Sequence, residues 1–296
     1  MKRALSVLVF LTVLAAPSPL FVQEWHLDVP FVPTRPEVVA KMLEMARVGK
    51  NDILYDLGCG DGRIVITAAK RYGTRGVGID INPERIAESR ENAAREGVAS
   101  LVKFLEQDLF QTDFHEATVV TLYLLSSVNL KLRPILFAQL APGTRVVSHD
   151  FAMDSWKPDD SAVVEANGMT HDVYFWLMPA NASGSWSWTW PEGVKAAPCQ
   201  LVLDQHFQAL TGRLEMAGTD FALIDPELSG DHIGFSIDRV EDGKTVRTEF
   251  RGRAVRDTID GTMTVRDSGK TAVKPWRAQR NPATRKAIDI DDSNRF

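Results

Sequence analysis

The chain has 296 residues, of which 44% are hydrophobic and 25% charged, and its net charge is −5. This composition is that of a folded globular protein, because a disordered chain carries far fewer apolar residues. Two cysteines are too few for a fold held together by disulfides. The acidic balance excludes a protein that binds nucleic acid through bulk positive charge. The length fits one or two domains.

The N-terminal segment has the pattern of an export signal. Lys2 and Arg3 precede an apolar run over residues 4–16, and small residues and prolines follow it. A basic start before an apolar run of roughly 7–15 residues is typical of a secretory signal. We therefore predict that residues 1–22 are a signal peptide or a membrane anchor. This prediction places the protein in the periplasm of a bacterium or at the face of its inner membrane.

Strand and helix patterns alternate after a proline-rich lead-in at residues 29–36. Helices are predicted over residues 37–46, 63–72, 83–96 and 128–140. Strands are predicted over residues 53–56, 75–81, 101–106, 118–125 and 144–150, with two more over 162–165 and 173–178. This alternation predicts an α/β domain over residues 29–179 with a doubly wound, parallel, Rossmann-like sheet.

The second half of the chain has strand patterns and no convincing helix. Strands are predicted over residues 185–190, 199–203, 207–216, 220–223, 232–240, 245–254 and 258–265. Their spacing predicts a mostly antiparallel β barrel or sandwich of about seven strands over residues 184–280. Trp186, Trp188 and Trp190 alternate along one strand, so they share a face that either packs in the core or forms a ligand platform. The polar residues 281–296 are predicted to be a disordered tail.

A glycine-rich loop follows the first predicted strand, with the sequence Asp56-Leu-Gly58-Cys-Gly60-Asp-Gly62. Glycines adopt backbone conformations with positive φ and let a ligand lie against the main chain. At the carboxyl edge of a parallel sheet, such a loop predicts a nucleotide pocket. The glycine spacing differs from that of the dinucleotide-binding motif.

Two further acids end the next two predicted strands. Asp80 ends the second strand, where a carboxylate can accept hydrogen bonds from both ribose hydroxyls. Asp108 follows the third strand, where it can accept from an adenine amino group while Leu109 lies against the ring. No cluster of basic residues accompanies them to bind phosphate. The pattern therefore favours an unphosphorylated nucleoside that carries a cationic group.

This combination of glycine loop and strand-end acids resembles the class I S-adenosylmethionine-dependent methyltransferases. The resemblance covers residues 34–178. It implies S-adenosyl-L-methionine as cofactor and the fold of that class. It also implies these contacts: Gly58 and Gly60 against the methionine part, Asp56 near the cationic end, Asp80 on the ribose, and Asp108 with Leu109 at the adenine.

Three segments are similar to a narrower family. They are Pro30–Thr34, Tyr55–Ile64 and Thr118–Leu125, and they resemble the mitochondrial lysine methyltransferases that modify the adenine nucleotide translocase and the c subunit of ATP synthase, with their prokaryotic relatives. The resemblance implies methyl transfer to an amine, with a protein lysine as acceptor. It also implies that Thr34 contacts the cleft. The strand-rich second half has no counterpart in that family.

Three residues are catalytic candidates. Tyr123, at the end of the fourth predicted strand, either orients an amine or packs in the core. His149 and Asp150 end the fifth strand, where they act as a base or amine acceptor at the cleft mouth, or merely bond the strand end. The sequence around Tyr123 lacks the Asn/Asp-Pro-Pro-aromatic motif of adenine methylation. Neither cysteine has metal-ligand spacing, and no metal is expected.

Two other functions remain open from the sequence. One is a small-molecule methyltransferase whose cleft is capped by the β domain, and the other is a non-catalytic envelope binding protein on a methyltransferase scaffold. The expected partners are a protein or small-molecule methyl acceptor, no nucleic acid, and a membrane contacted through the N-terminus. An exported location is in tension with the cofactor, which is made in the cytosol.

Overall fold

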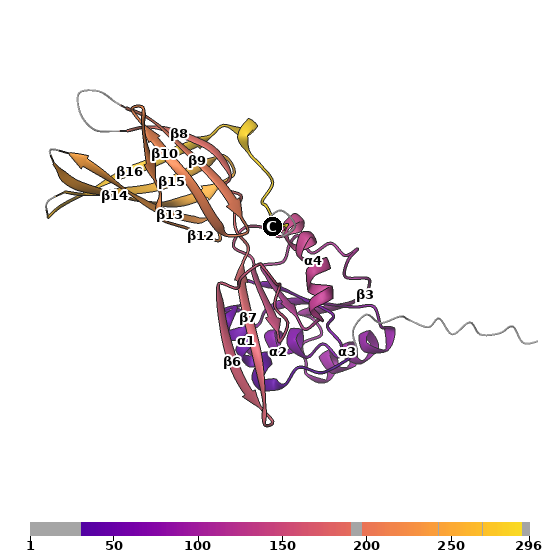
Figure 1. The fold of residues 1–296 in the computed structure, drawn as a ribbon. Coiled ribbons are helices and arrows are strands. Elements are labelled where there is room, and N and C mark those ends of the chain that lie inside the picture. Colours follow the sequence, from indigo (N-terminus) through magenta and orange to yellow (C-terminus); the bar gives the residue numbers. More distant parts are fainter. Residues whose placement is uncertain (1–30, 191–196, 242, 268, 292–296) are drawn as a thin grey trace, which may run out of the picture.

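The computed structural model describes residues 31–190, 197–241, 243–267 and 269–291 (Figure 1). The predicted signal peptide or anchor at residues 1–22 lies outside these ranges. Within them, no helix combines the length and the apolar character needed to cross a membrane.

The first half of the described chain forms a seven-stranded sheet with helices on both faces (Figure 1). Its helices are α1 (Pro36–Met45), α2 (Arg63–Tyr72), α3 (Pro83–Arg95) and α4 (Ser126–Gln139). Its strands are β1 (Ile53–Leu57), β2 (Arg75–Asp80), β3 (Val102–Glu106), β4 (Val119–Leu122), β5 (Arg145–His149), β6 (Asp160–Ala166) and β7 (Met169–Leu177). The predicted Rossmann-like α/β architecture is confirmed.

The strand order is β3-β2-β1-β4-β5-β7-β6. Strands β1 to β5 run parallel, whereas β7 pairs antiparallel with β5, and β6 pairs antiparallel with β7. The hairpin turns at Asn167 and Gly168, which have φ values of 54° and 75°. Two positive φ values suit a tight hairpin between strands. The sheet is therefore mixed, and the expectation of a wholly parallel sheet is wrong for β6 and β7.

The two faces of this sheet are covered differently. Apolar residues of α1, α2 and α3 pack on one face, together with Leu54 of β1. Residues of α4 pack on the other face, together with Tyr55 and Leu57 of the same strand. Because successive side chains of a strand point to opposite faces, β1 contributes to both cores. Its carboxyl end is thereby fixed at the centre of the sheet.

The described residues of the second half form a nine-stranded antiparallel sheet in the order β11-β10-β9-β8-β16-β15-β14-β13-β12. The end strands approach their opposite neighbours, so the sheet is a nearly closed barrel (Figure 1). The strands are β8 (Gly184–Trp190), β9 (Ala197–His206), β10 (Ala209–Met216), β11 (Thr219–Ala222), β12 (Ile224–Ser229), β13 (His232–Glu241), β14 (Lys244–Val255), β15 (Thr258–Asp267) and β16 (Lys270–Arg280). The expected barrel is confirmed, with β12 and β16 in addition to the strands predicted.

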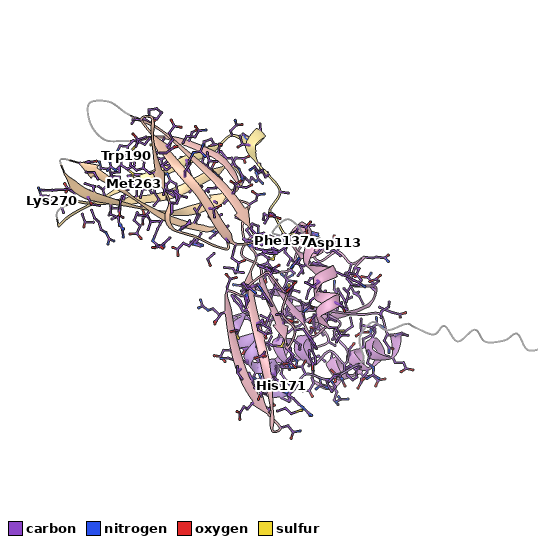
Figure 2. The ribbon with its side chains drawn as sticks, viewed as in Figure 1. Asp113, Phe137, His171, Trp190, Met263 and Lys270 are labelled. Carbon is purple, nitrogen blue, oxygen red and sulfur yellow. The ribbon has the colours of Figure 1, made fainter. Side chains whose placement is uncertain are left out.

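Aromatic side chains fill the barrel. Trp186 and Trp190 are buried in its core, and the partly buried Trp188 packs against that core. Figure 2 labels Trp190. The rings of Phe250 and Trp276 meet edge to face with centroids 5.1 Å apart. The tryptophans of β8 therefore belong to the core rather than to a ligand platform.

The two halves meet at a packed junction. Phe207, in the turn between β9 and β10, stacks on Trp156 at 6.1 Å and lies 5.8 Å from Phe137 of α4. Backbone atoms also join the halves, since Ala180 N donates to Gly230 O at 2.7 Å. The barrel thus inserts a side chain into the core of the first half.

The segment after β16 differs from the predicted disordered tail. Residues 281–291 begin with a short helical turn (η1, Pro282–Thr284) and return toward α4 (Figure 1). Asp289 pairs with His206 of β9, and Arg133 of α4 donates to Ile290 O at 3.1 Å. These contacts order residues 281–291 along the junction, while 292–296 lie outside the described residues.

Candidate active site

A cleft of about 280 Å³ opens at the carboxyl ends of the parallel strands. It brings together most of the residues that the sequence analysis singled out. The predicted residues in its wall are Thr34, Asp56, Gly58, Gly60, Asp80, Asp108, Leu109 and Tyr123. The strand ends of β1, β2, β3 and β4 therefore converge on one cavity.

The glycine loop has the backbone conformation that only glycine adopts freely. Gly58 and Gly60 have φ values of 85° and 52°. A Cβ on Gly60 would lie 2.3 Å from the ring of Phe31, and one on Gly58 would lie 2.8 Å from Leu124. The loop is therefore closely packed beneath the cleft and leaves no room for side chains there.

Asp80 holds the glycine loop and faces the cleft. One carboxylate oxygen accepts from Gly60 N at 2.9 Å, and the other accepts from Asn82 N at 2.9 Å. Because a carboxylate has about four lone-pair sites, both oxygens can accept further hydrogen bonds. Asp80 is thus fixed in position and still able to bind a pair of hydroxyls.

Asp56 is a buried carboxyl at the floor of the cleft. Only 2% of the residue is exposed, and Thr121 Oγ1 donates to Asp56 Oδ1 at 2.7 Å. Burial raises the pKa of Asp56 to about 7, and the nearby charges of Asp80 and Asp61 act in the same direction. A bound cation would favour its ionised form.

Asp108 and Leu109 follow β3 at the far side of the cleft. Asp108 Oδ1 accepts from Phe110 N at 2.9 Å, and Oδ2 accepts from Gln111 Nε2 at 3.0 Å. These bonds cap the turn that presents Leu109 to the cavity. The carboxylate and the apolar side chain therefore lie together, as the recognition of a heteroaromatic ring requires.

The arginines that line the described cleft are paired with other acids. Arg63 pairs with Asp61 at 2.5 Å and also donates to Thr34 O at 2.9 Å. Arg85 pairs with Glu88 at 2.5 Å, and its guanidinium lies 4.7 Å from the ring of Phe31. Arg63 therefore ties the lead-in to the glycine loop, and neither pair neutralises Asp80.

Tyr123 lies in the cleft wall in front of His149. Their ring centroids are 3.8 Å apart, with a tilt of 30°. Burial raises the pKa of Tyr123, and the charge of Asp150 raises it further. Its hydroxyl therefore keeps its proton at neutral pH. A protonated phenol can donate or accept a hydrogen bond at the cleft.

His149 and Asp150 do not line the cleft with the other candidates. His149 is 1% exposed, and its Nδ1 lies 3.2 Å from Thr34 Oγ1. Burial lowers the pKa of His149 to about 4, so the ring is neutral at pH 7. Asp150 turns away from the cavity and meets His171 of β7, which the sequence analysis did not single out. These groups lie behind Tyr123.

The structure adds cleft residues that the sequence analysis missed. They come from the lead-in, from the start of α3 and from the segments after β3, β4 and β5. They include Phe31, Asn82, Arg85, Gln107, Leu125, Val128 and Phe151. Within the described residues, the lining includes none from the barrel. The described part of the barrel therefore does not line the cleft.

The donor set of the cleft fits the cofactor that the resemblance implies. Asp56 and Asp80 offer negative charge without an arginine partner, which suits a ligand with a cationic group. The floor is glycine backbone, and the walls are mostly apolar. Asp80 can hold the ribose, Asp108 with Leu109 the adenine, and Asp56 can face the cationic end.

Comparisons with known proteins agree with this geometry. Residues 56–160 match the ANTKMT methyltransferase domain. A protein-lysine N-methyltransferase from Saccharolobus islandicus is 48% identical over 151 residues, which is 51% of this chain and 94% of that protein. The adenine nucleotide translocase lysine N-methyltransferase of Mus musculus is 35% identical over 134 residues, 45% of this chain and 58% of that protein.

A solved structure is also similar to the first half. It is an RNA methyltransferase from Salinibacter ruber in complex with S-adenosyl-L-homocysteine. Its sequence is 59% identical to the chain, the match covers 49% of this chain and 93% of that one, and the TM-score is 0.47. The chain spans little more than half of the mouse relative, and the family match ends at residue 160, before the barrel begins at β8.

Proposed function

The chain belongs to the family of class I S-adenosylmethionine-dependent lysine methyltransferases, and we propose that it methylates a lysine side chain of a protein. The cofactor supplies an activated methyl group on its sulfonium centre. One observation carries the proposal: Asp56, Asp80, Asp108 and Tyr123 line the same cleft. The archaeal relative that the chain covers almost fully is itself a protein-lysine methyltransferase.

The acceptor amine must be neutral before it can attack. A free lysine has a pKa of about 10.4, so the cleft has to favour the uncharged form. Phe31, Leu125 and Phe151 line the cleft with apolar surface. Removal of water by such surface lowers the pKa of an amine. The proton leaves to solvent through the open mouth before the lysine is fully enclosed.

Tyr123 orients the amine. Its hydroxyl keeps its proton because burial raises its pKa, and its oxygen accepts a hydrogen bond from the amine. That bond aims the nitrogen lone pair along the floor of the cleft. Alignment of the reacting groups as a whole contributes up to about 7–11 kcal/mol to well-oriented reactions, and one hydrogen bond supplies a small part of it. The ring of His149, 3.8 Å behind, keeps Tyr123 in place.

A labelled methyl donor tests the acceptor. The full chain is incubated with cell lysate and isotopically labelled S-adenosylmethionine, and label is followed in proteins, RNA and small molecules. We expect label on lysine side chains of protein, identified by mass spectrometry of peptides. Label confined to RNA or to small molecules would reject the lysine proposal.

Tyr123→Phe tests the role of the hydroxyl. We expect kcat to fall about tenfold, equivalent to about 1.4 kcal/mol, because one orienting hydrogen bond is lost. The affinity for the cofactor should not change. Tyr72→Phe is the matched control, since Tyr72 is exposed at the end of α2, outside the cleft. An unchanged kcat for Tyr123→Phe would assign Tyr123 to packing alone.

Residues 1–22 are proposed to anchor the protein to the membrane with the cleft on the cytosolic side. Support comes from the apolar run over residues 4–16, which the apolar residues 20–22 extend toward the roughly 20 residues that a membrane span needs, and from the cytosolic origin of the cofactor. Cell fractionation tests this proposal by comparing the full chain with residues 23–296. The full chain should sediment with membranes and the shortened chain should not. Equal recovery of both in the soluble fraction would contradict an anchor.

A further inference from the structure

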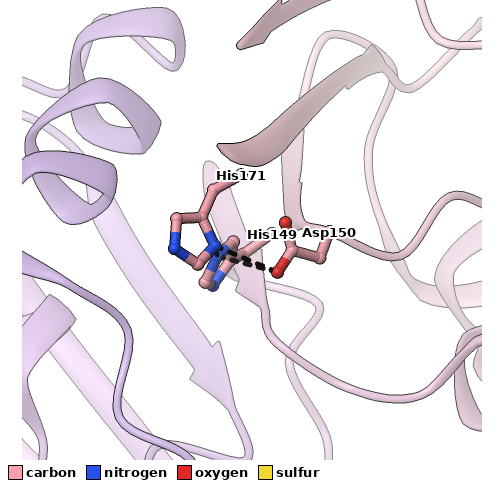
Figure 3. A group of neighbouring side chains, drawn as sticks. All are labelled: His149, Asp150 and His171. Carbon is pink, nitrogen blue, oxygen red and sulfur yellow. Dashed lines mark hydrogen bonds and ion pairs between the residues drawn. The ribbon is translucent and has the colours of Figure 1, made fainter. Parts of the chain in front are cut away.

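Three side chains converge behind the cleft wall, on the strands at the antiparallel edge of the first sheet. His149 and Asp150 come from the end of β5, and His171 comes from β7 (Figure 3). His149 Nε2 lies 3.0 Å from His171 Nδ1. Asp150 Oδ2 lies 3.2 Å from His149 Nε2 and 3.2 Å from His171 Nδ1. The three atoms form a nearly equilateral triangle.

The size of this triangle matches a metal coordination sphere. Metal–donor bonds of about 2.1 Å that meet at right angles place neighbouring donors about 3.0 Å apart, and tetrahedral angles place them about 3.4 Å apart. The observed 3.0 and 3.2 Å lie in that range. Two imidazoles and one carboxylate on one face are a donor set that divalent transition metals accept.

Hydrogen bonds satisfy the triangle in only one pair of neutral tautomers, in which His149 Nε2 and His171 Nδ1 both carry protons and donate to Asp150 Oδ2. If His171 Nδ1 carries a proton and donates it to Asp150, the lone pair of His149 Nε2 has no proton to accept. If His149 Nε2 carries the proton, the lone pair of His171 Nδ1 faces the carboxylate. In these two arrangements, where only one of the facing nitrogens is protonated, the other nitrogen opposes the carboxylate oxygen as a second acceptor, which is unfavourable. A divalent cation at the centre attracts all three.

The surroundings hold the donors in place. Thr34 Oγ1 lies 3.2 Å from His149 Nδ1 and can accept its proton, which leaves Nε2 as the ligand atom. Asp172 N donates to Asp150 Oδ1 at 2.9 Å, which leaves Oδ2 for the triangle. Asp150 has a φ of 59°, a strained conformation for a residue with a side chain. These constraints aim the donor atoms before any ion arrives.

The exposure of the three side chains also fits a metal site that keeps coordination positions open to solvent. The side chains of His149 and His171 are 1% and 11% exposed, while that of Asp150 is 29% exposed. Solvent therefore reaches the triangle from the side of Asp150. His171 Nε2 is buried without a hydrogen-bond partner among the described residues, so its ring is placed by the Nδ1 side alone.

We propose that His149, Asp150 and His171 bind one divalent transition-metal ion. The ion joins the end of β5 to β7 and fixes the ring on which Tyr123 rests. The sequence predicts no metal, because neither cysteine has ligand spacing and the third ligand lies 21 residues beyond Asp150 on a paired strand. The metal site does not depend on methyl transfer. An experiment can therefore reject the metal proposal or the lysine methylation proposal without rejecting the other.

Zn²⁺ and Co²⁺ are the probes that test the site. The untagged full chain is stripped with chelator and titrated with Zn²⁺ by calorimetry, and with Co²⁺ by visible absorption. We expect one ion per chain, a dissociation constant in the micromolar range or tighter, and a rise in thermal midpoint on binding. His171→Ala should weaken binding at least hundredfold. Asp150→Asn, which keeps the side-chain shape, should also weaken it.

The matched control is His115→Ala. His115 pairs with Asp113 at 2.6 Å on the surface, so it is a histidine–aspartate pair without the third donor. This variant should bind the ion as the wild type does. Absence of a stoichiometric ion in the wild type would overturn the proposal, as would an affinity equal to that of the wild type in both His171→Ala and Asp150→Asn. Binding of S-adenosylmethionine is measured in the same proteins. A loss of cofactor affinity without a loss of metal affinity would count against the cleft assignment and not against the metal site.

Discussion

The cleft holds a buried carboxyl without a cationic partner, whereas the barrel holds a buried cation with many partners. Asp56 receives one side-chain hydrogen bond, from Thr121. Arg280 of β16 is 2% exposed and donates to Asp257 Oδ1 at 2.9 Å, to Asn181 O at 2.8 Å and to Ser183 O at 3.0 Å. A fully paired charge serves the fold, while an unpaired one in a cleft marks a place for a ligand.

The largest effect is expected in the barrel. Arg280→Met removes a buried cation and leaves the carbonyls of Asn181, Ser183 and Arg256 without their donor, while Asp257 keeps Arg285. We therefore expect a loss of about 3–5 kcal/mol in the free energy of unfolding. Denaturant unfolding of the full chain measures it. Arg277→Met is the control, since Arg277 is exposed on the same strand.

Cofactor affinity should not change in Arg280→Met at temperatures where the chain is folded, because the described cleft lining includes no barrel residue. A large loss of cofactor affinity together with small destabilisation would show that the two regions are coupled.

A pair of glycine variants separates backbone strain from crowding in the cleft. Gly60 and Gly97 have positive φ values of 52° and 72°. A Cβ on Gly60 meets Phe31, whereas one on Gly97 meets no atom within 4 Å. We expect Gly60→Ala to weaken S-adenosylmethionine binding between tenfold and hundredfold in calorimetry, about 1.4–2.8 kcal/mol.

Gly97→Ala should bind the cofactor as the wild type does, although it is somewhat less stable. Equal affinities for the two variants would mean that the glycine loop is not part of the cofactor site.

The unpaired carboxyl predicts a pH dependence of cofactor binding. With a pKa of about 7, Asp56 is mostly protonated at pH 6 and mostly ionised at pH 8. Because a cationic ligand favours the ionised form, affinity should be about tenfold weaker at pH 6 than at pH 8. Asp56→Asn controls for titration of the ligand itself and should lose this dependence. The same change of cofactor affinity with pH in the wild type and in Asp56→Asn would contradict a role for Asp56.

The same group predicts how stability changes with pH. The folded chain keeps the Asp56 proton up to about pH 7, whereas the unfolded chain loses it near pH 4. The contribution of Asp56 to the free energy of unfolding is therefore fully present below pH 4. It is lost as pH rises toward 7, by up to about 1.4 kcal/mol per pH unit. Relative to Asp56→Asn, the wild type should lose stability from pH 5 to pH 7.

The cofactor side of the cleft was predictable because each of its residues lies at, or just after, the carboxyl end of a strand. Asp56, Asp80 and Asp108 need only local patterns to be found, since the carboxyl ends of parallel strands meet at one edge. Tyr123 was placed by the same rule. Phe31 was missed because no local pattern shows that the lead-in folds back over the glycine loop.

The features that were missed depend on long-range pairing. β12 contains Pro226 and a register shift, and the first half of β16 is exposed, so neither has clear alternation. The antiparallel direction of β7 brings His171 to His149, and strand patterns carry no direction. The order of residues 281–291 likewise comes from contacts with Asn181 and Arg133 rather than from their own polar sequence.

Calorimetric titration of S-adenosylmethionine and S-adenosylhomocysteine into wild type and Asp80→Ala tests the central claim most directly. Asp238→Ala is the control, because Asp238 is a barrel carboxylate paired with Arg247. We predict micromolar binding in wild type and control, and at least a hundredfold loss in Asp80→Ala, equivalent to about 2.8 kcal/mol. Binding that is absent from the wild type, or unchanged in Asp80→Ala, would contradict the assignment of this cleft.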